Sequence, residues 1–344
     1  MAIHTPHLYD IMKELDLFKK QCDDYEEFRT HAFALLRTCL YYVVEDDKFY
    51  TFQGVDGSGE LVGRTKRGLL SCYDCWVYDF NIGGENKKVN IIKEYVNGVE
   101  PDVKVYDRAI FYPGVSTDDR ALNLYTGFGR EQTEQFSEDE IKSLEENELK
   151  PYVDHIKKCW CGEDEELYNY VDTWIGYTVK HPEIKLGVAL RLKGLPCSGK
   201  TIIVTLLGEV LKNRGINRPL CSRQITTPKY NHLRANSALV SIDELYFYRG
   251  KRARNIVNRL LTENSIKVDK RYLDVYYNVI TETTVDDKIP EDELERYCIL
   301  NTVEIEDPDH TSNLMALDPQ VLYNYFCSKE YPEGFQNIKP PHTR

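Results

Sequence analysis

The pattern of apolar and polar positions divides the first half of the chain into stretches of different period. Residues 8–42 place apolar side chains at mixed steps of three and four, which indicates helices. Residues 40–112 hold short runs rich in aromatic and β-branched residues instead, such as 41–44 and 76–80, separated by glycine-containing turns. These stretches predict a small α+β module.

Helical periodicity returns at residues 165–180, where apolar side chains share one face. That face is formed by Leu167, Tyr170, Val171, Trp174, Ile175 and Thr178. His181 and Pro182 end this helix, because a residue that precedes proline disfavours the helical conformation. From 186 to about 305 strand and helix patterns alternate, which predicts a layered αβα domain of the α/β class.

Changes in pattern suggest four segments. They are an N-terminal α+β accessory module (1–130), an acidic and helical collar-like region (131–185), the α/β domain (186–305), and a C-terminal tail (306–344) with a helix at 319–328. The stretch 131–150 carries eight Asp or Glu against two Lys. We expect a solvated linker and helix face there, since charge runs usually face water.

The sequence GLPCSGKT, residues 194–201, fits the pattern G-x-x-x-x-G-K-[ST] of a phosphate-binding loop (P-loop). An apolar run precedes it at 188–192, and a run without a breaker follows at 202–211, so the loop joins a strand to a helix. In such a loop backbone N–H groups surround phosphate oxygens, the lysine reaches the β- and γ-phosphates, and the threonine hydroxyl binds Mg²⁺. The predicted nucleotide-binding residues are Gly194, Pro196, Ser198, Gly199, Lys200 and Thr201. The expected cofactors are ATP and Mg²⁺.

A P-loop ATPase also needs an acidic element. The stretch ALVSIDE, residues 238–244, fits this need, because it is an apolar strand pattern that ends in two carboxylates. Asp243 lies 43 residues after Lys200. We expect Asp243 to hold the metal, directly or through water, and Glu244 to act as the general base that orients the attacking water.

A basic stretch is unusual in so acidic a chain: residues 249–271 carry eight Lys or Arg and two acids, whereas the whole chain has a net charge of −12. Residues 254–261 read as an amphipathic helix, and 266–275 alternate like a β-hairpin with its basic tip beside the ATP site. Such a hairpin suits contact with a nucleic-acid backbone. The predicted contact residues are Lys267, Lys270 and Arg271.

Two further polar positions follow. The strand 276–280 leads into Thr281–Thr284, where a polar side chain could sense the γ-phosphate. Arg296 emerges from an acidic surround before the strand 298–300, and is expected to reach the ATP of a neighbouring subunit and stabilise transition-state charge.

The ten cysteines include the pairs Cys72/Cys75 and Cys159/Cys161. Together they could form a four-thiolate zinc site. Reduced thiols of a cytosolic protein are the favoured interpretation, because the two pairs lie in unlike contexts. The chain shows no signal-peptide pattern and no apolar stretch of about 20 residues, so we expect a soluble, cytoplasmic protein without a membrane partner.

In their order along the chain, GLPCSGKT, ALVSIDE, KVDKRYLD and ERY resemble the superfamily 3 helicases, and in particular the helicase part of viral, phage and plasmid primase-helicases. The stretch ALNLYTGF, residues 121–128, is similar to a segment that precedes the helical region in that family. The resemblance covers roughly residues 110–305. It implies nucleotide, metal and DNA roles for the residues named above, an AAA+-like ATPase core, and a γ-phosphate sensor at Thr284, where the family usually has asparagine.

The resemblance also implies a ring, expected to be hexameric, that translocates on single-stranded DNA in replication, with ATP at subunit interfaces. Basic hairpins in a central channel would reconcile DNA binding with the net charge of −12. Residues 1–130 show no convincing primase centre, so a primase would be either a separate chain or a segment of a longer parent chain, and a polymerase would be a separate partner. The alternative function is a P-loop ATPase motor for packaging or remodelling that does not unwind DNA.

Overall fold

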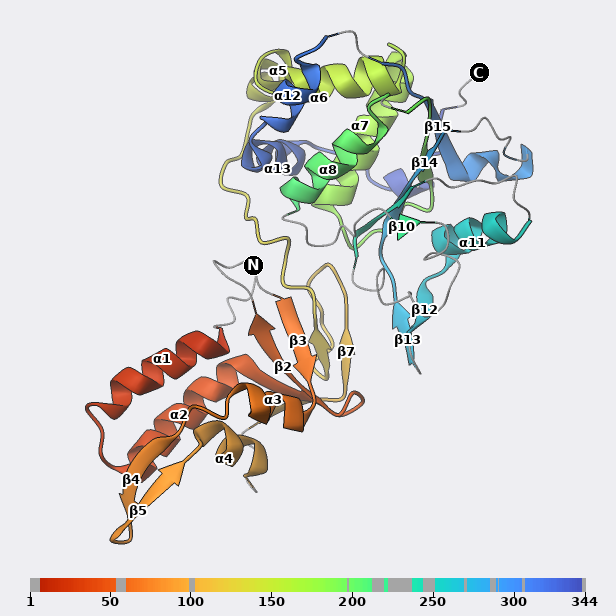
Figure 1. Cartoon of the computed structure of the whole chain (residues 1–344). Coiled ribbons are helices and arrows are strands. Elements are labelled where there is room, and N and C mark those ends of the chain that lie inside the picture. The colour runs from red at the N-terminus through yellow and green to blue at the C-terminus, as the bar shows by residue number, and fades with distance from the viewer. Residues whose placement is uncertain are drawn as a thin grey trace. The chain divides into compact units, whose positions relative to one another are not determined.

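The computed structural model describes residues 7–53, 60–98, 103–196, 198–211, 220–221, 237–243, 251–268, 271–284, 289, 291–304 and 307–341. Its contacts divide the chain into two compact units (Figure 1). Unit 1 comprises residues 1–110 and 115–126, and unit 2 comprises 111–114 and 127–344. The four segments suggested by the sequence are finer than this division, and their boundaries stay predictions.

Unit 1 mixes short helices with small sheets. Its elements are α1 (Leu8–Lys19), α2 (Tyr25–Cys39), β1 (Leu40–Val43), β2 (Lys48–Gln53), β3 (Glu60–Arg64), α3 (Lys66–Cys72), β4 (Tyr78–Ile82), β5 (Glu85–Val89), α4 (Ile91–Asn97), β6 (Lys104–Tyr106), β7 (Arg108–Ile110) and β8 (Ala121–Asn123). The larger sheet has the order β3-β2-β1-β6, and β4 and β5 form a separate hairpin.

The core of unit 1 lies between the helices and the β4–β5 hairpin. Leu8, Met12 and Leu15 are fully buried on one face of α1, at the spacing of an amphipathic helix. Phe28 of α2 packs against the ring of Phe80 in β4 with 5.1 Å between centroids. Unit 1 therefore has a hydrophobic core of its own.

Unit 2 contains the remaining elements. They are α5 (Glu138–Glu146), α6 (Lys150–Asp154), the π-helix η1 (His155–Trp160), α7 (Glu165–Lys180), β9 (Ala189–Lys193), α8 (Lys200–Val210), β10 (Leu220–Cys221), β11 (Leu239–Asp243), α11 (Lys251–Thr262), β12 (Ser265–Val268), β13 (Arg271–Asp274), β14 (Asn278–Thr283), the 3₁₀ helix η4 (Glu291–Arg296), β15 (Tyr297–Asn301), α12 (His310–Met315), α13 (Pro319–Ser328) and the 3₁₀ helix η5 (Phe335–Asn337).

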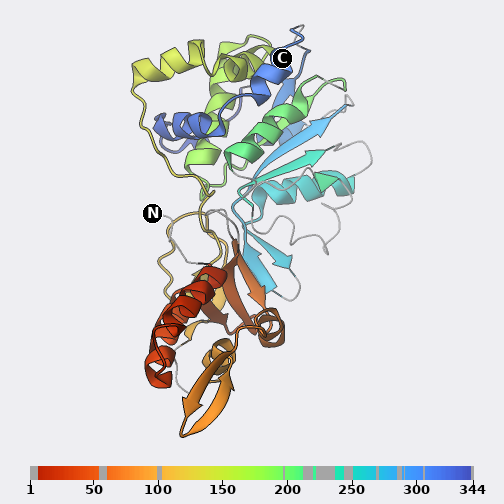
Figure 2. The ribbon, with the colours of Figure 1, turned by 60° about the vertical axis from the view of Figure 1, so that its left-hand side comes forward.

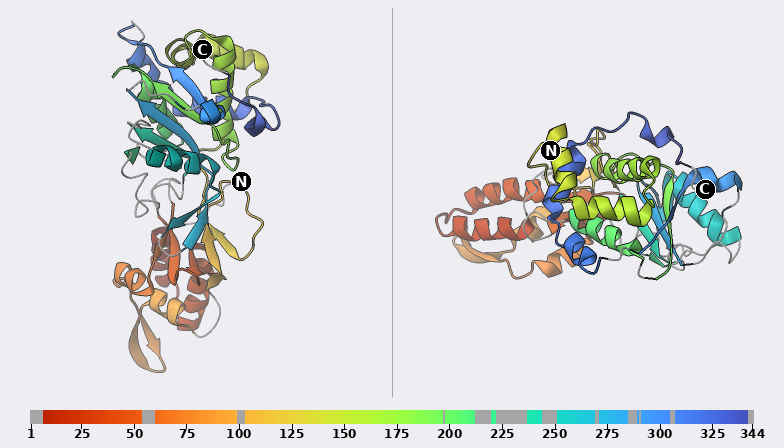
Figure 3. Two further views of the ribbon diagram at one scale, coloured as in Figure 1. Left: turned by 90° about the vertical axis from the view of Figure 1, so that its right-hand side faces the viewer. Right: turned by 90° about the horizontal axis from the view of Figure 1, so that it is seen from above.

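A five-stranded parallel sheet forms the centre of unit 2, in the order β10-β11-β14-β9-β15. Helices lie on both of its faces, with α7 and α8 on one side and α11 on the other (Figures 2 and 3). Leu260 and Leu261 of α11 pack into a buried cluster with Val240 of β11 and Val279 of β14. Strands covered on both faces read as nearly continuous apolar runs, which is why 188–192 and 238–242 are recognisable in the sequence despite the buried polar residues Arg191 and Ser241.

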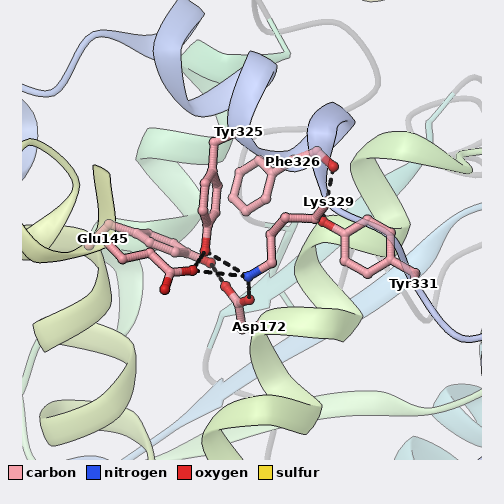
Figure 4. Close-up of polar contacts among 7 residues, drawn as sticks. Glu145, Asp172, Tyr325, Phe326, Lys329 and Tyr331 are labelled. Carbon is pink, nitrogen blue, oxygen red and sulfur yellow. Dashed lines mark hydrogen bonds and ion pairs between the residues drawn. The ribbon is translucent and has the colours of Figure 1, made fainter. Parts of the chain in front are cut away.

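A polar cluster joins the helices that cover one face. We call Glu145, Asp172, Tyr325 and Lys329 the carboxylate–lysine cluster (Figure 4). The ammonium of Lys329 contacts Asp172 at 2.6 Å and Glu145 at 3.2 Å, and the Tyr325 hydroxyl donates to Glu145 at 2.7 Å. The Asp172 side chain is only 6% exposed, so its charge depends on Lys329 for compensation.

Most expected elements are confirmed, and several coincide with their predicted bounds. Helix α7 spans 165–180, with Asp164 capping its first turn and His181 at its end, and α13 spans 319–328. Helix α5 lies in the acidic stretch and buries no residue, as expected. Within the described residues, every helix is too short or too polar to cross a membrane.

One strand boundary was predicted wrongly. The sequence placed a strand at 276–280 and polar residues after it, but β14 runs from Asn278 to Thr283. Thr281 and Thr283 lie inside the parallel sheet because β14 pairs with β9 through Thr283, and with β11 through Thr281. The polar side chains here are therefore buried strand residues.

Candidate functional site: the P-loop and its acidic edge

The P-loop connects the carboxyl end of β9 to the first turn of α8, and two of its glycines are required by geometry. Gly199 precedes α8 with φ of 72°, a left-handed conformation that favours glycine. A Cβ at Gly194 would lie 2.1 Å from the hydroxyl oxygen of Thr302 and 2.6 Å from that of Ser198. Neither position accepts a side chain without rearrangement.

Lys200 places its ammonium inside the loop to which it belongs. Its Nζ donates to the carbonyl oxygens of Gly194 at 2.8 Å and Leu195 at 2.6 Å, and the residue is only 8% exposed. These carbonyl groups are neutral acceptors, and an ammonium binds an anionic phosphate oxygen more strongly. The loop therefore holds a buried cation that a phosphate could reach by replacing weaker partners.

Hydroxyl groups tie the loop to Thr302, the residue that directly follows the edge strand β15. Ser198 Oγ and Thr302 Oγ1 are 2.6 Å apart, and Thr302 Oγ1 donates to the Lys193 carbonyl at 3.1 Å. The Gly194 N–H donates to the carbonyl of Thr283 at the end of β14. The loop is thus anchored on strands at both sides of β9.

Side chains of the π-helix η1 donate hydrogen bonds to carbonyl groups of the P-loop. His155 Nε2 donates to the Gly199 carbonyl at 2.9 Å, Trp160 Nε1 donates to the same oxygen at 3.4 Å, and Cys159 Sγ donates to the Ser198 carbonyl at 3.1 Å. These three side chains fix two peptide groups of the loop. Their role could not be read from the sequence, which carries no P-loop signal in this segment.

His155 is itself held by a second histidine. His310 of α12 places its Nε2 2.9 Å from His155 Nδ1, and the two rings are nearly parallel. Burial lowers the pKa of His155 to about 4, and His310 adds to this effect, against the hydrogen bond to Gly199, which raises the pKa. The ring is therefore neutral at physiological pH, and it can donate through one nitrogen while it accepts through the other.

The acidic side of the site is formed at the carboxyl ends of β14 and β11. Thr201 Oγ1 donates to Glu282 Oε2 at 2.7 Å, and Glu282 is only 2% exposed. Ile242 of β11 pairs with Thr281 of β14, so Asp243 and Glu282 follow at the same level on neighbouring strands. Parallel strands present their carboxyl ends at one edge of the sheet, where α/β proteins commonly bind ligands.

These residues fit a magnesium ion by their chemistry. Mg²⁺ prefers oxygen ligands and is usually held by one or two carboxylates together with substrate phosphates. Thr201 is exposed at the first turn of α8, and Asp243 is exposed at the end of β11, so both side chains are accessible beside the loop. The hydroxyl of Thr201 and the carboxylate of Asp243 are the groups that would hold the ion, with Glu282 behind them.

No protein-family model matches the chain. No curated protein sequence matches it either. Among solved structures, the apo NrS-1 C terminal region matches in two structures, one of them an A form, with a TM-score of 0.62 at 12% identity, over 87% of this chain and 68% of that one. An A form of the same region, 305–718, gives 0.59 over 87% and 67%. The chain shares its fold with the NrS-1 C terminal region.

Two weaker matches are a full-length MCM homolog from Methanopyrus kandleri and the JCV helicase. The first has a TM-score of 0.36 at 12% identity over 73% of this chain and 55% of that one. The second has a TM-score of 0.32 at 13% identity over 54% and 57%. Scores this low do not establish a common fold, and the fold shared with NrS-1 says nothing by itself about activity.

The other predicted site residues lie in several places. Pro196 is exposed in the loop, and Thr284 directly follows β14, which leaves its sensing role a prediction. Glu244 and Lys270 lie outside the described residues. The side chains of two more predicted contact residues, Lys267 and Arg271, also lie outside what is described, although their backbones form β12 and β13.

The structure corrects the expected position of the basic hairpin. Its base lies where Val275 donates to the Asn264 carbonyl, three residues before Asn278 begins β14. The base is therefore at the amino end of the parallel sheet, whereas the P-loop follows the carboxyl end of β9. The base of the hairpin is thus not beside the P-loop, because the length of the strands separates the two edges of the sheet.

Arg296 lies at the same amino edge. It ends η4, and the next residue, Tyr297, pairs with Ala189 at the start of β9. The five residues of β9 separate that level from the P-loop, which corresponds to about 16 Å at ~3.3 Å per residue. Arg296 is thus placed away from the P-loop of its own chain.

The cysteine pairs lie in different units. Cys72 and Cys75 are exposed in unit 1, whereas Cys159 and Cys161 are buried in unit 2. Burial raises the pKa of Cys159 to about 11, which favours a protonated thiol. Over the described ranges, no three or more His, Cys, Asp or Glu side chains gather where they could hold a metal ion.

Proposed function

We propose that this protein is an ATP-driven motor that moves on single-stranded DNA, with an AAA+-like core of the superfamily 3 helicase type. The observation that carries the proposal is the buried ammonium of Lys200, which lies within a loop that requires glycine at two positions and that leads into the N-terminus of α8. A helix N-terminus with a buried cation in front of it suits the phosphates of a nucleotide. ATP and Mg²⁺ are the proposed cofactors.

The acidic edge supports hydrolysis as well as binding. Asp243 and Glu282 stand at the carboxyl edge beside Thr201, where they would hold the metal and its hydroxyl ligand. Glu244 directly follows Asp243 in the sequence, and we assign it the role of orienting the attacking water. Bound Mg²⁺ would neutralise charge that develops on the phosphates.

The amino edge supports assembly. Arg296 lies one strand length from the P-loop of its own chain, so a charge-stabilising role in hydrolysis requires the ATP of a neighbouring subunit. A repeated contact of this head-to-tail kind closes into a ring. We therefore propose a homo-oligomeric ring, hexameric as in the resembled family, with ATP between subunits. A primase or polymerase is a proposed further partner.

The basic hairpin is the proposed contact with DNA. Hairpins that emerge from the edge opposite the nucleotide can move along a strand while ATP is hydrolysed at the subunit interface, and cationic side chains bind the backbone of a single strand without sequence preference. The net charge of −12 limits such contact to a local surface.

The test compares stimulation of ATP hydrolysis by single-stranded DNA in two double variants. Lys270→Ala with Arg271→Ala should abolish the stimulation and leave nucleotide affinity unchanged. The matched control is Lys87→Ala with Lys88→Ala, which removes two exposed adjacent lysines from the β4–β5 hairpin and should retain the stimulation. Equal stimulation in wild type and the first variant would remove the DNA contact from the hairpin.

The same assay separates the second possible function. A chain that hydrolyses ATP at a rate indifferent to both DNA and RNA would be a P-loop ATPase for packaging or remodelling, and a protein partner would then have to supply the stimulus.

A further inference from the structure

The contact between Thr201 and Glu282 has a direction. A hydroxyl group carries one hydrogen and two lone pairs. The Thr201 hydrogen points to Glu282 Oε2 at 2.7 Å, because a carboxylate oxygen can only accept. The lone pairs of the Thr201 oxygen are consequently left for another partner. The hydroxyl is fixed as an oxygen ligand.

The two partners differ sharply in exposure. Glu282 is buried on β14, between β9 and β11, whereas Thr201 is exposed at the first turn of α8. A carboxylate in the middle of a buried sheet is unfavourable unless hydrogen bonds compensate it. Glu282 thus contacts the Thr201 hydroxyl from the protein interior. The side of the Thr201 oxygen that faces solvent stays accessible to a ligand.

Asp243 occupies a different position. It lies at the same level on the neighbouring strand and is exposed, so it can contact a ligand in front of the loop. The hydrogen of the Thr201 hydroxyl is already used by Glu282. The two carboxylates at this edge therefore lie in different positions: Glu282 lies on the interior side of the Thr201 hydroxyl, and Asp243 lies on the neighbouring strand, exposed to solvent.

We propose that Glu282 is a positioning residue that directs the Thr201 oxygen toward the divalent cation of a bound nucleotide. Outer partners of this kind fix the orientation of a metal ligand and make it more basic. The inference rests on the proposed function and adds to it a carboxylate from β14, a strand in which the sequence predicted no site residue, since the predicted sensor Thr284 directly follows it. Glu282 itself does not touch the cation.

The test measures the affinity of a fluorescent ATP analogue in excess Mg²⁺ and in EDTA. Glu282→Met keeps the length of the side chain but removes both oxygens that can accept from Thr201, and Thr201→Val removes the hydroxyl at constant size. Glu282→Met should reduce the Mg²⁺-dependent gain in affinity by roughly 10–100-fold, the range found for outer partners of metal ligands. Thr201→Val, which removes the ligand itself, should reduce the gain by at least as much. The affinity in EDTA should stay within about twofold, since the remaining loop is intact.

A double variant and a matched control sharpen the result. Glu282→Met combined with Thr201→Val should lose no more than Thr201→Val alone, because the carboxylate acts through the hydroxyl. Glu209→Met makes the same substitution on an exposed position of the last turn of α8 and should keep the wild-type gain.

Three results would overturn the inference in different ways. A Glu282→Met variant with the full Mg²⁺-dependent gain would show that Glu282 does not position the hydroxyl, while the proposed function stands. If Glu282→Met does not fold, a Thr201→Val variant with the full gain would show that no hydroxyl ligand exists to be positioned. A wild-type protein that binds no nucleotide in either buffer would remove the proposed function and the inference together.

Discussion

Gly199→Ala is the substitution that most directly tests the support of the P-loop by η1. The alanine would have to adopt φ of 72°, which costs about 1–2 kcal/mol for a residue with a Cβ. Its Cβ would also lie 2.5 Å from His155 Cε1 and 3.2 Å from Cys159 Sγ. Overpacking of this kind costs about 1–3 kcal/mol, so the free energy of unfolding of unit 2 should fall by about 2–5 kcal/mol.

Gly187→Ala is the matched control. Gly187 has φ of 70°, but a Cβ there meets no atom within 4 Å, so only the backbone penalty of about 1–2 kcal/mol applies. The chain has three tryptophans, of which Trp160 and Trp174 are buried in unit 2. In a Trp76→Phe background, urea unfolding followed by tryptophan fluorescence therefore reports on unit 2 alone.

A double variant isolates the ring contact. His155→Ala alone leaves the Gly199 carbonyl without that donor, which costs about 1–3 kcal/mol. In the double variant His155→Ala also makes room for the new methyl group of Gly199→Ala. The loss of unfolding free energy in the double variant should therefore be about 1–3 kcal/mol smaller than the sum of the losses in the two single variants. Equal destabilisation by Gly199→Ala and Gly187→Ala, together with strict additivity of the pair, would refute the packing of η1 on the loop.

Three further predictions concern other parts of unit 2. Burial lowers the pKa of His155 to about 4, so between pH 6.5 and pH 4 the unfolded chain binds a proton at this ring and the folded chain does not. The free energy of unfolding should therefore fall by up to about 3 kcal/mol from pH 6.5 to pH 4. Urea titrations at each pH measure this dependence, and His155→Gln should remove that part of it. Lys329→Met leaves the carboxylates of the carboxylate–lysine cluster uncompensated and should lower the free energy of unfolding by about 3–5 kcal/mol in the same assay. The control Lys339→Met, at an exposed ion pair, should lower it by at most about 1 kcal/mol. Similar losses in the two variants would show that the cluster does not stabilise unit 2. Mixing Arg296→Ala subunits with Lys200→Ala subunits should restore part of the ATP hydrolysis that each lacks, and no restoration at any ratio would exclude action across an interface.

The sequence predicted the parts of unit 2 whose periodicity reflects burial. Helix α7 could be bounded to the residue because its apolar face, its Asp164 cap and the following His181–Pro182 all agree. The strand before the P-loop and the strand that ends in Asp243 could be found because both faces of the sheet are covered, which makes each strand a nearly continuous apolar run.

What the sequence left out depends on contacts between distant segments. Glu282 was placed after a strand because glutamate and its threonine neighbours resemble a polar strand end; only the pairing of β14 on both sides shows that they lie inside the sheet. His155 and His310 are 155 residues apart, and no local pattern joins them to the P-loop. Reduced thiols were the favoured interpretation of the pair Cys159/Cys161, but no sequence pattern indicates that Cys159 donates to the Ser198 carbonyl of the P-loop.

The central claim is that the loop around Lys200 drives a motor on single-stranded DNA. The most direct measurement is the rate of ATP hydrolysis by the purified protein with and without single-stranded DNA, beside Lys200→Ala and the control Lys142→Ala, an exposed lysine on α5. We predict hydrolysis that DNA stimulates in wild type and Lys142→Ala, and that Lys200→Ala abolishes. Hydrolysis that persists in Lys200→Ala, or that DNA leaves unchanged in wild type, would contradict the account.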